Sequence, residues 1–261
     1  MQKALSVGNI IALIITIVIN YFSNTGIFNG NTMSTVSATY SNYFTPAGYA
    51  FSIWGLIYVG LFAFIIYHST VVFKSGNTKN VALNVGWWFV ISCVANCLWI
   101  FSWLYEYTGL SVIIMMVLLF SLIMIILKTR MELDDLPKNQ ILFVWWPFSL
   151  YSGWITVALM ANIAAYLTKI SWDGLGIPGD YWTVIMIITA GLVHLFMILK
   201  RNMREFALAG VWALIAIAVA NRGNNTMIVQ VAIAVSVLLF ISVAIHAYIN
   251  RKSLPWLPMK N

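Results

Sequence analysis

Residues 109–127 read GLSVIIMMVLLFSLIMIIL, a stretch of nineteen residues without a charged side chain. A helix needs about 20 mostly apolar residues to cross a bilayer. Lipid offers no hydrogen-bonding partners, so a spanning segment must pair every backbone N–H and C=O internally, as a helix or in a closed barrel. The apolar run is continuous and does not alternate with a period of two, which favours a helix over a barrel strand. This stretch therefore predicts a transmembrane helix.

Seven more apolar runs take up most of the remaining chain. They are residues 4–22, 50–73, 81–104, 140–167, 182–199, 206–220 and 227–249. The run 206–220 is short for a span and is the weakest candidate. The expected fold class is all-α, a polytopic transmembrane helical bundle of about eight spans.

The composition agrees with a membrane protein. Hydrophobic residues make up 62% of the chain and charged residues 8%, and the mean hydropathy is +0.90. An ordinary soluble domain carries about 25% charged residues. The net charge is +7, but the basic residues lie between the apolar runs and form no large patch, so no nucleic-acid partner is expected. The partner that the composition predicts is the lipid bilayer.

The distribution of lysine and arginine predicts an orientation. If the N-terminus is cytoplasmic and each of the eight runs crosses the bilayer once, twelve of the fourteen basic residues lie on the cytoplasmic side. The other two are Lys169 and Arg222. Cytoplasmic loops carry the excess of positive charge in membrane proteins. We therefore expect a multi-pass integral membrane protein with both termini in the cytoplasm.

One connection is unusually long. Residues 23–49 form an outer loop without a charged side chain, rich in Ser, Thr, Asn, Gly and Tyr. Loops of this length in compact proteins are usually functional or disordered. A lid over an outward-facing cavity and a mobile cap are both consistent with it. A second outer loop, residues 171–180, is rich in turn-forming residues and could fold beside the first.

Ionisable residues are scarce inside the runs. Glu106 stands at an outer end, and three histidines, expected at the headgroup boundary, stand towards the inner ends: His68, His194 and His246. This argues against an ion-driven transporter or a charge-conducting channel. Without a carboxylate pair or a cluster of metal ligands, we expect no catalytic residue of acid–base or metal-hydrolase type and no metal site. Cys93 and Cys97 are interpreted as packing residues.

The runs carry aromatic and amide side chains instead. These are Trp54 and Tyr58 in the second run, Asn96, Trp99 and Trp103 in the third, and Tyr151, Trp154 and Asn162 in the fifth. An asparagine in a membrane helix needs a hydrogen-bonding partner, so Asn96 and Asn162 should face the bundle interior. Two interpretations stay open: contacts that hold the helices together, or a flat apolar pocket with a few polar groups that suits a planar hydrophobic ligand.

Three spacings among these residues resemble a known family. They are Pro46-x7-Trp54-x3-Tyr58, Asn96-x2-Trp99 and Tyr151-x2-Trp154-x7-Asn162, in this order and on the expected helices. They are similar to the motifs of the tryptophan-rich sensory proteins (TspO), the bacterial relatives of the mitochondrial translocator protein. Two positions depart from the family pattern, since Ala47 and Leu150 stand where the family has proline.

The resemblance covers residues 1–167, a five-helix unit with the long loop, whereas residues 168–261 add three helices that the family lacks. It implies a cavity for porphyrins, haem-related tetrapyrroles, sterols or benzodiazepine-like drugs, a possible homodimer, and a place in the bacterial cytoplasmic membrane. No cofactor is required, and porphyrin or haem is a possible ligand. The ligand-binding residues expected from it are Pro46, Trp54, Tyr58, Asn96, Trp99, Tyr151, Trp154 and Asn162.

Three functions remain in view at this point. The leading one is a non-enzymatic membrane protein that binds a planar hydrophobic ligand as a sensor or carrier. The second is an enzyme for light- or oxygen-dependent porphyrin modification, with Trp54 and Trp154 as redox-capable side chains. The third is a facilitative transporter whose route runs between the five-helix part and the three added helices.

Overall fold

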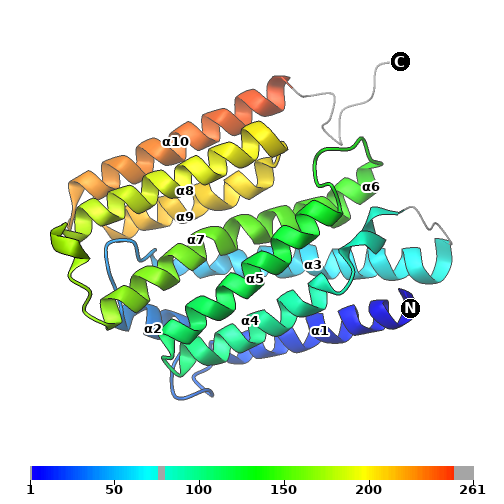
Figure 1. Ribbon diagram of the computed structural model, residues 1–261, viewed down its shortest axis with the longest axis horizontal. Coiled ribbons are helices and arrows are strands. Elements are labelled where there is room, and N and C mark those ends of the chain that lie inside the picture. Colours follow the sequence, from blue (N-terminus) through cyan, green and yellow to red (C-terminus); the bar gives the residue numbers. More distant parts are fainter. Residues whose placement is uncertain (1, 76–79, 250–261) are drawn as a thin grey trace.

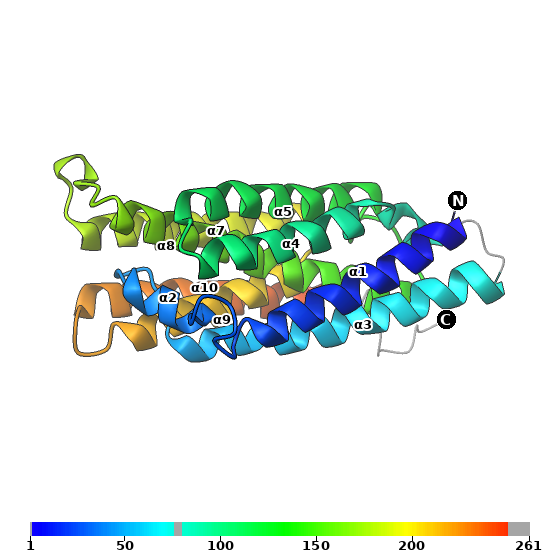
Figure 2. The ribbon, with the colours of Figure 1, turned by 90° about the horizontal axis from the view of Figure 1, so that it is seen from below.

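The structure is a computed structural model that describes residues 2–75 and 80–249. All regular elements in this part of the chain are helical, which confirms the all-α class. The long helices run along one direction and form a bundle (Figures 1 and 2). Their bounds are α1 Gln2–Phe22, α3 Ile53–Thr70, α4 Trp88–Leu104, α5 Thr108–Lys128, α7 Trp146–Lys169, α8 Gly179–Arg201, α9 Arg204–Ala220 and α10 Thr226–Ile249.

Shorter helical segments extend or join the long helices. The helix α2, Met33–Thr39, lies within the long outer loop, and a 3-10 turn, Gly48–Ser52, leads into α3. The remaining short segments are the π-helix Val71–Ser75, the 3-10 helix Val81–Val85, α6 Lys138–Gln140, the π-helix Ile141–Trp145 and the 3-10 helix Gly174–Gly176. The long loop is thus partly helical.

Six of the helical stretches in the described residues are long and apolar enough to cross a membrane: Gln2–Phe22, Gly48–Lys74, Thr108–Lys128, Lys138–Lys169, Gly179–Arg201 and Thr226–Ile249. The apolar helix α4 is shorter, with 17 residues. The helix α9 also has 17 residues and opens with Arg204 and Glu205. The structure therefore confirms a polytopic bundle with six candidate spans, and spanning by α4 and α9 stays a prediction.

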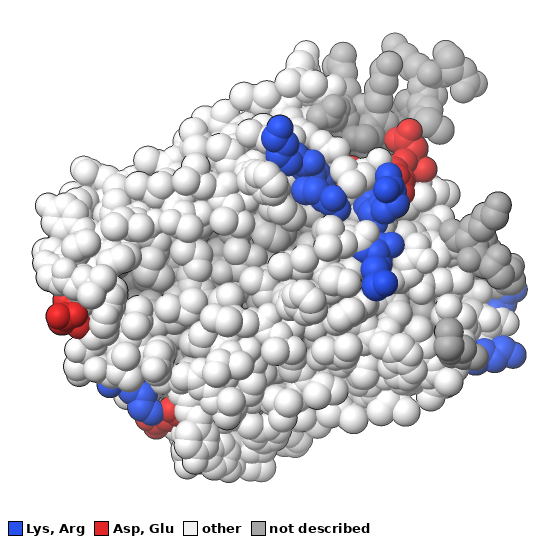
Figure 3. All heavy atoms as spheres, in the orientation of Figure 1, with Lys and Arg blue, Asp and Glu red and all other residues white. Residues whose placement is uncertain are grey.

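The surface has the character of a protein that faces lipid. Large apolar side chains are exposed along the helices, among them Val59 at 68% and Leu192 at 62%, whereas Asn96 is fully buried. Charged side chains lie towards the two ends of the molecule on the face shown in Figure 3, and a broad uncharged belt separates them. Four basic residues that contribute to the predicted charge asymmetry lie outside the described residues: Lys79, Arg251, Lys252 and Lys260.

The first five long helices and the last three form two groups that meet at α7 and α9. In Figure 1, α8, α9 and α10 lie along one side of α7, and α1, α3, α4 and α5 lie on the other. The helix α7 contacts α5, α3 and α9, and one continuous apolar core runs from Leu13 to Leu239. The core therefore continues across residue 167, the boundary expected between the two parts.

Two glycines allow close contact between helices, Gly153 between the two groups and Gly210 between α9 and α8 within the second group. A Cβ atom on Gly153 of α7 would lie 2.2 Å from the carbonyl oxygen of Phe206 on α9, so only glycine lets the two backbones approach this closely. On α9, a Cβ atom on Gly210 would lie 2.4 Å from the imidazole ring of His194. His194 is fully buried there, and His68 is fully buried as well. Their burial shows that these two histidines face the bundle interior, and the expectation that they lie at the depth of the headgroups stays a prediction.

α1 begins and α10 ends at the same end of the bundle (Figure 1). We call this the inner end and the opposite one the outer end. The long loop with α2, the α7–α8 connection and the α9–α10 turn all lie at the outer end (Figure 2).

Candidate functional site

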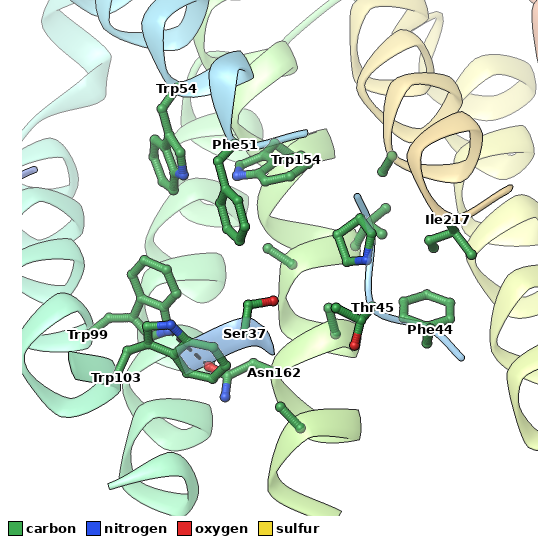
Figure 4. A pocket seen from close by; sticks show the side chains of 16 residues that line it. Ser37, Phe44, Thr45, Phe51, Trp54, Trp99, Trp103, Trp154, Asn162 and Ile217 are labelled. Atoms are coloured by element: carbon green, nitrogen blue, oxygen red, sulfur yellow. Dashed lines mark hydrogen bonds between the residues drawn. The ribbon is translucent and has the colours of Figure 1, made fainter. Parts of the chain in front are cut away.

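A small cavity of about 50 Å³ lies in the outer half of the bundle. The largest side chains that line it come from α3, α4, α7 and the long outer loop (Figure 4). We call it the aromatic cavity. Its lining residues are Ser37, Phe44, Thr45, Pro46, Phe51, Trp54, Trp99, Trp103, Trp154, Val157, Ala158, Ala161, Asn162, Ala165, Ala213 and Ile217.

Trp54 stands at the centre of the aromatic wall. Its ring stacks on Tyr58 with 5.5 Å between centroids and 20° between planes. Trp99 lies 6.4 Å away, and Trp154 lies 6.5 Å away at 83°, edge to face. Such offset and edge-to-face pairs each contribute about 0.5–1.5 kcal/mol beyond area burial. Three helices are thus joined by ring contacts that leave flat faces towards the cavity.

Buried amides fix the orientation of these rings. The side-chain oxygen of Asn162, on α7, accepts a hydrogen bond from Trp99 Nε1 at 2.8 Å, and its amide nitrogen donates to Ser111 Oγ at 2.8 Å. Asn96, on α4, donates to the Tyr151 hydroxyl at 3.1 Å and accepts from Asn20 at 2.8 Å. Both predicted asparagines are buried and paired, so the prediction that they face the interior is confirmed.

Asn20 was missed from the sequence, although its signal is present. On α1 the buried positions are Leu5, Ser6, Asn9, Leu13, Thr16 and Asn20. From Ser6 onward they follow alternating spacings of three and four residues, which is the seam of a helix packed against neighbours. Several members of the seam are polar, and a polar seam in a membrane helix indicates interhelical hydrogen bonds.

Two buried donors near the cavity have no hydrogen-bonding partner within the described residues. They are the indole Nε1 of Trp154 and the hydroxyl of Tyr58. A buried donor left without a partner costs about 1–3 kcal/mol. A ligand with an acceptor at its edge would recover that free energy at Trp154, which lines the cavity.

The eight predicted ligand-binding residues fall into two layers. Five of them line the aromatic cavity: Pro46, Trp54, Trp99, Trp154 and Asn162. The other three do not line it. Tyr58 lies behind Trp54, and Asn96 and Tyr151 are hydrogen-bonded to each other in the layer behind the wall. The expectation that Tyr58 and Asn96 line the cavity was therefore wrong, and their part in ligand binding stays a prediction.

The helix α9 completes the cavity, which the division at residue 167 did not anticipate. Ala213 and Ile217 form part of its wall (Figure 4 labels Ile217). The same helix holds residues 43–47, which we call the strap. Asn221 Nδ2 donates to the Tyr43 carbonyl at 2.9 Å, and the Ala47 amide donates to the Ala216 carbonyl at 3.0 Å.

The long loop closes the cavity from the outer end. The helix α2 is capped at Thr32, whose hydroxyl accepts from the Thr35 amide, and Ser37 of this helix faces the cavity. Trp103 Nε1 donates to the Met33 carbonyl at 3.3 Å. The loop is therefore folded and anchored on the bundle, which supports the lid interpretation over a mobile cap.

Glu106 anchors this lid, a role that the sequence did not reveal. Its carboxylate accepts hydrogen bonds from the Tyr40 hydroxyl at 2.5 Å and from Asn31 Nδ2 at 3.3 Å. Its backbone carbonyl accepts from Lys169 Nζ, at the end of α7, at 2.5 Å. The hydrogen bond from Tyr40 is the main reason that the pKa of Glu106 lies below its ordinary value.

A second cavity, the outer groove, opens beside the first. Its volume is about 830 Å³, and it lies between the strap, α7, α8, α9 and the α7–α8 connection. Its lining residues are Ser41, Asn42, Tyr43, Phe44, Thr45, Pro46, Met160, Ile163, Ala164, Leu167, Thr168, Trp172, Asp173, Gly174, Ile177, Gly179, Trp182, Thr183, Met186, Ala220, Asn221 and Asn224.

The described residues contain no group of three or more His, Cys, Asp or Glu side chains that could hold a metal ion. Cys93 is buried and Cys97 half-buried, and both are free thiols. The site therefore offers ring faces, amides and small residues as its chemical groups.

An all-helical bundle with an apolar surface and an internal aromatic cavity is typical of a multi-pass membrane protein that binds a ligand. A family described as TSPO-like protein matches residues 6–245, and the chain belongs to this family. The match extends through the three C-terminal helices, beyond the residues on which the motif resemblance rests. No curated protein and no solved structure matches the chain.

Proposed function

We propose that the protein binds a planar hydrophobic ligand of the tetrapyrrole class in the aromatic cavity and acts as a sensor or carrier. The observation that carries this proposal is the arrangement of Trp54, Trp99 and Trp154 around one void. Flat ring faces favour a flat apolar ligand through stacking, and Trp154 Nε1 offers a donor to its polar edge. Membership of the TSPO-like family supports a ligand-binding role.

The aromatic cavity is too small for such a ligand in this conformation. Its volume of about 50 Å³ is far below the 300–1,000 Å³ of sites that enclose drug-sized ligands. A tetrapyrrole therefore binds only after the strap and α2 move outward, because the helices that form the other walls are joined by the hydrogen bonds of Asn162 and Asn96. Binding is then coupled to displacement of the lid.

The lining favours a metal-free porphyrin over haem. Protein ligands of haem iron are histidine, cysteine, methionine or tyrosine side chains. None of the described residues that line the cavity is of these types. The site would hold a porphyrin ring by its faces and leave a haem iron without an axial protein ligand.

In the membrane, we propose that all eight long helices span the bilayer with the inner end in the cytoplasm. The charge asymmetry of the sequence supports this orientation, since Lys169 and Arg222 are the only basic residues at the outer ends of described helices. A reporter enzyme fused after Asn261 tests it. Activity confined to the cytoplasmic side agrees with the proposal, and activity confined to the outside contradicts it.

Porphyrin modification is a second candidate function. Trp54 and Trp154 lie 6.5 Å apart and face the same void, so both redox-capable rings would contact one bound porphyrin. The decay of porphyrin fluorescence under light and oxygen, with and without the protein, separates this enzyme from a binding protein. A transporter between the two helix groups has less support, because α7 and α9 are in backbone contact at Gly153.

The experiment that tests the proposed function is a titration of the purified protein with protoporphyrin IX. Replacement of Trp154 by alanine should weaken binding by about 1–3 kcal/mol, the scale of a large buried aromatic contact. Trp87→Ala is the matched control, because Trp87 is 53% exposed and does not line the cavity. Equal affinity in the two variants would overturn the proposal, and Trp154→Phe, which keeps a ring but removes the Nε1 donor, should give an affinity between those of the native protein and Trp154→Ala.

A further inference from the structure

The aromatic cavity and the outer groove share one wall. Phe44, Thr45 and Pro46 line both of them. The small aromatic cavity and the much larger outer groove are therefore separated by three residues of one chain segment. Phe44 is fully buried between them, whereas Thr45 and Pro46 are half-buried.

This wall lies in the strap, which has no regular secondary structure over residues 43–47. Hydrogen bonds to α9 hold it in place. Asn221 Nδ2 donates to the Tyr43 carbonyl at 2.9 Å, and the Ala47 amide donates to the Ala216 carbonyl at 3.0 Å. Just beyond the strap, Trp212 Nε1 donates to the Ala50 carbonyl at 3.1 Å. These hydrogen bonds join the strap and the following turn to α9, and they can break without unfolding any helix.

We propose that the outer groove is a second ligand site, through which a flat amphiphile reaches the aromatic cavity when the strap leaves α9. The choice of ligand class rests on the proposed function. Asn221 is then the residue that latches the strap, and the three C-terminal helices build the groove. The aromatic cavity is filled from between the two helix groups at the outer end.

The size and lining of the groove fit this role. A volume of about 830 Å³ lies within the range that encloses drug-sized ligands. Trp172 and Trp182 line it with 5.2 Å between ring centroids, and Trp182 is fixed by a hydrogen bond from Nε1 to the Gly174 carbonyl. Met160 and Met186 also line the groove and offer adaptable apolar surface. An amphiphile would rest its apolar body on these side chains.

The route can be tested without knowing the ligand, by the rate at which a thiol in the aromatic cavity is labelled from outside. Ala213 lines the cavity and is 1% exposed, so Ala213→Cys reports on access to it. The native thiols are first removed by Cys93→Ala and Cys97→Ala. The probe is 2-aminoethyl methanethiosulfonate, which forms a disulfide with the cysteine thiolate and releases methanesulfinate. Its positive charge is compatible with the groove, where Asp173 is the charged residue in the described lining.

Loss of the latch should speed labelling. Asn221→Ala removes the hydrogen bond to the strap, and we expect the labelling rate to rise about fivefold, equivalent to about 1 kcal/mol. Asn224→Ala is the matched control, because this exposed asparagine lines the same groove without a side-chain bond to the strap among the described contacts. Equal rates in the two variants would overturn the role of Asn221.

Filling the groove should slow labelling. Ala164→Phe places a ring in the groove from α7, and Ala244→Phe places one on an exposed face of α10 as a control. If Ala164→Phe fails to fold, Asn224→Trp obstructs the groove from an exposed position. Undiminished labelling in a folded groove-filled variant would overturn the route. The result does not depend on porphyrin binding, so absence of tetrapyrrole affinity would overturn the proposed ligand and leave the route to be judged by labelling alone.

Discussion

The hydroxyl of Tyr40, at the end of α2, donates a hydrogen bond to the carboxylate of Glu106 at the turn between α4 and α5, over 2.5 Å. Lys169 lies over the same tyrosine ring, with its Nζ 5.4 Å from the centroid. This pair joins the lid to the bundle at the point where α4 and α7 end and α5 begins. The charge of Glu106 strengthens the contact, because hydrogen bonds to ionised acceptors are stronger than those between neutral groups.

Tyr40→Phe should loosen the lid without disturbing the cavity wall. The variant loses one hydrogen bond at a partly exposed site, which corresponds to about 1 kcal/mol. We expect faster amide hydrogen exchange in the strap and α2, measured by mass spectrometry in lipid nanodiscs, and unchanged exchange in α5. Tyr107→Phe serves as the control, since Tyr107 is 63% exposed at the same turn. Identical exchange in the Tyr40 and Tyr107 variants would contradict the anchoring role.

The same pair predicts a pH dependence. The hydrogen bond from Tyr40 is the main cause that lowers the pKa of Glu106 below 4.5. In turn, the hydrogen bond to Glu106, followed by burial, raises the pKa of Tyr40 to about 12. A carboxyl with a lowered pKa stabilises the folded state above its unfolded pKa, and that contribution is lost as the pH falls through the folded value. A phenol with a raised pKa stabilises the folded state at pH values below its unfolded pKa. That contribution is lost as the pH rises through the folded pKa.

The stability difference between the native protein and Glu106→Gln should therefore be constant from about pH 5 to pH 9. It should shrink as the pH falls below about 4, because the native carboxyl becomes protonated and loses its charge. Thermal unfolding in detergent micelles across this range measures the difference. A difference that stays the same down to pH 3 would show that the ionised form of Glu106 contributes nothing.

Gly153→Ala should separate α7 from α9. The added Cβ would meet the Phe206 carbonyl oxygen at 2.2 Å, and backbone atoms cannot yield as the end of a flexible side chain would. Overpacking of this kind costs about 1–3 kcal/mol and sometimes more. Unfolding by sodium dodecyl sulfate should show this loss, whereas Gly55→Ala should be neutral or slightly stabilising because no atom lies within 4 Å of its Cβ position. Equal stability of the two variants would refute the close contact.

Much of the fold could be predicted from the sequence because lipid imposes strong rules. The run 109–127 became α5, Thr108–Lys128, almost residue for residue. The prediction of one helix over 81–104 was less accurate. The regular helix α4 begins only at Trp88, and a turn at Gly86, with φ of +59°, precedes it. Apolar content marks which residues leave water but does not mark where a helix breaks inside the apolar run.

The candidate site was predicted in its parts more than in its arrangement. Spacing on one helix placed Trp54, Trp99 and Trp154 correctly on the interior, but it could not tell which side chain touches the void and which lies behind it. For example, the spacing could not show that Tyr58 stacks on Trp54 and does not line the cavity. The share of α9 in the site depends on contacts between residues more than 150 positions apart, such as Asn221 with Tyr43, and a single sequence carries no signal for them.

Glu106 illustrates the same limit. At the end of an apolar run it looks like an ordinary boundary residue, and its two partners Asn31 and Tyr40 stand in a loop without charges. Only the folding of that loop over the end of α4 brings the three together.

The central claim is that a tetrapyrrole binds between the tryptophans of the aromatic cavity after displacement of the strap. The most direct measurement is an experimental structure of the protein saturated with protoporphyrin IX. We expect the ring system between Trp54 and Trp154, with Phe44–Pro46 moved away from α9 and the Trp99–Asn162 hydrogen bond retained. A porphyrin bound on the lipid-facing surface, with the strap and the cavity unchanged, would contradict it.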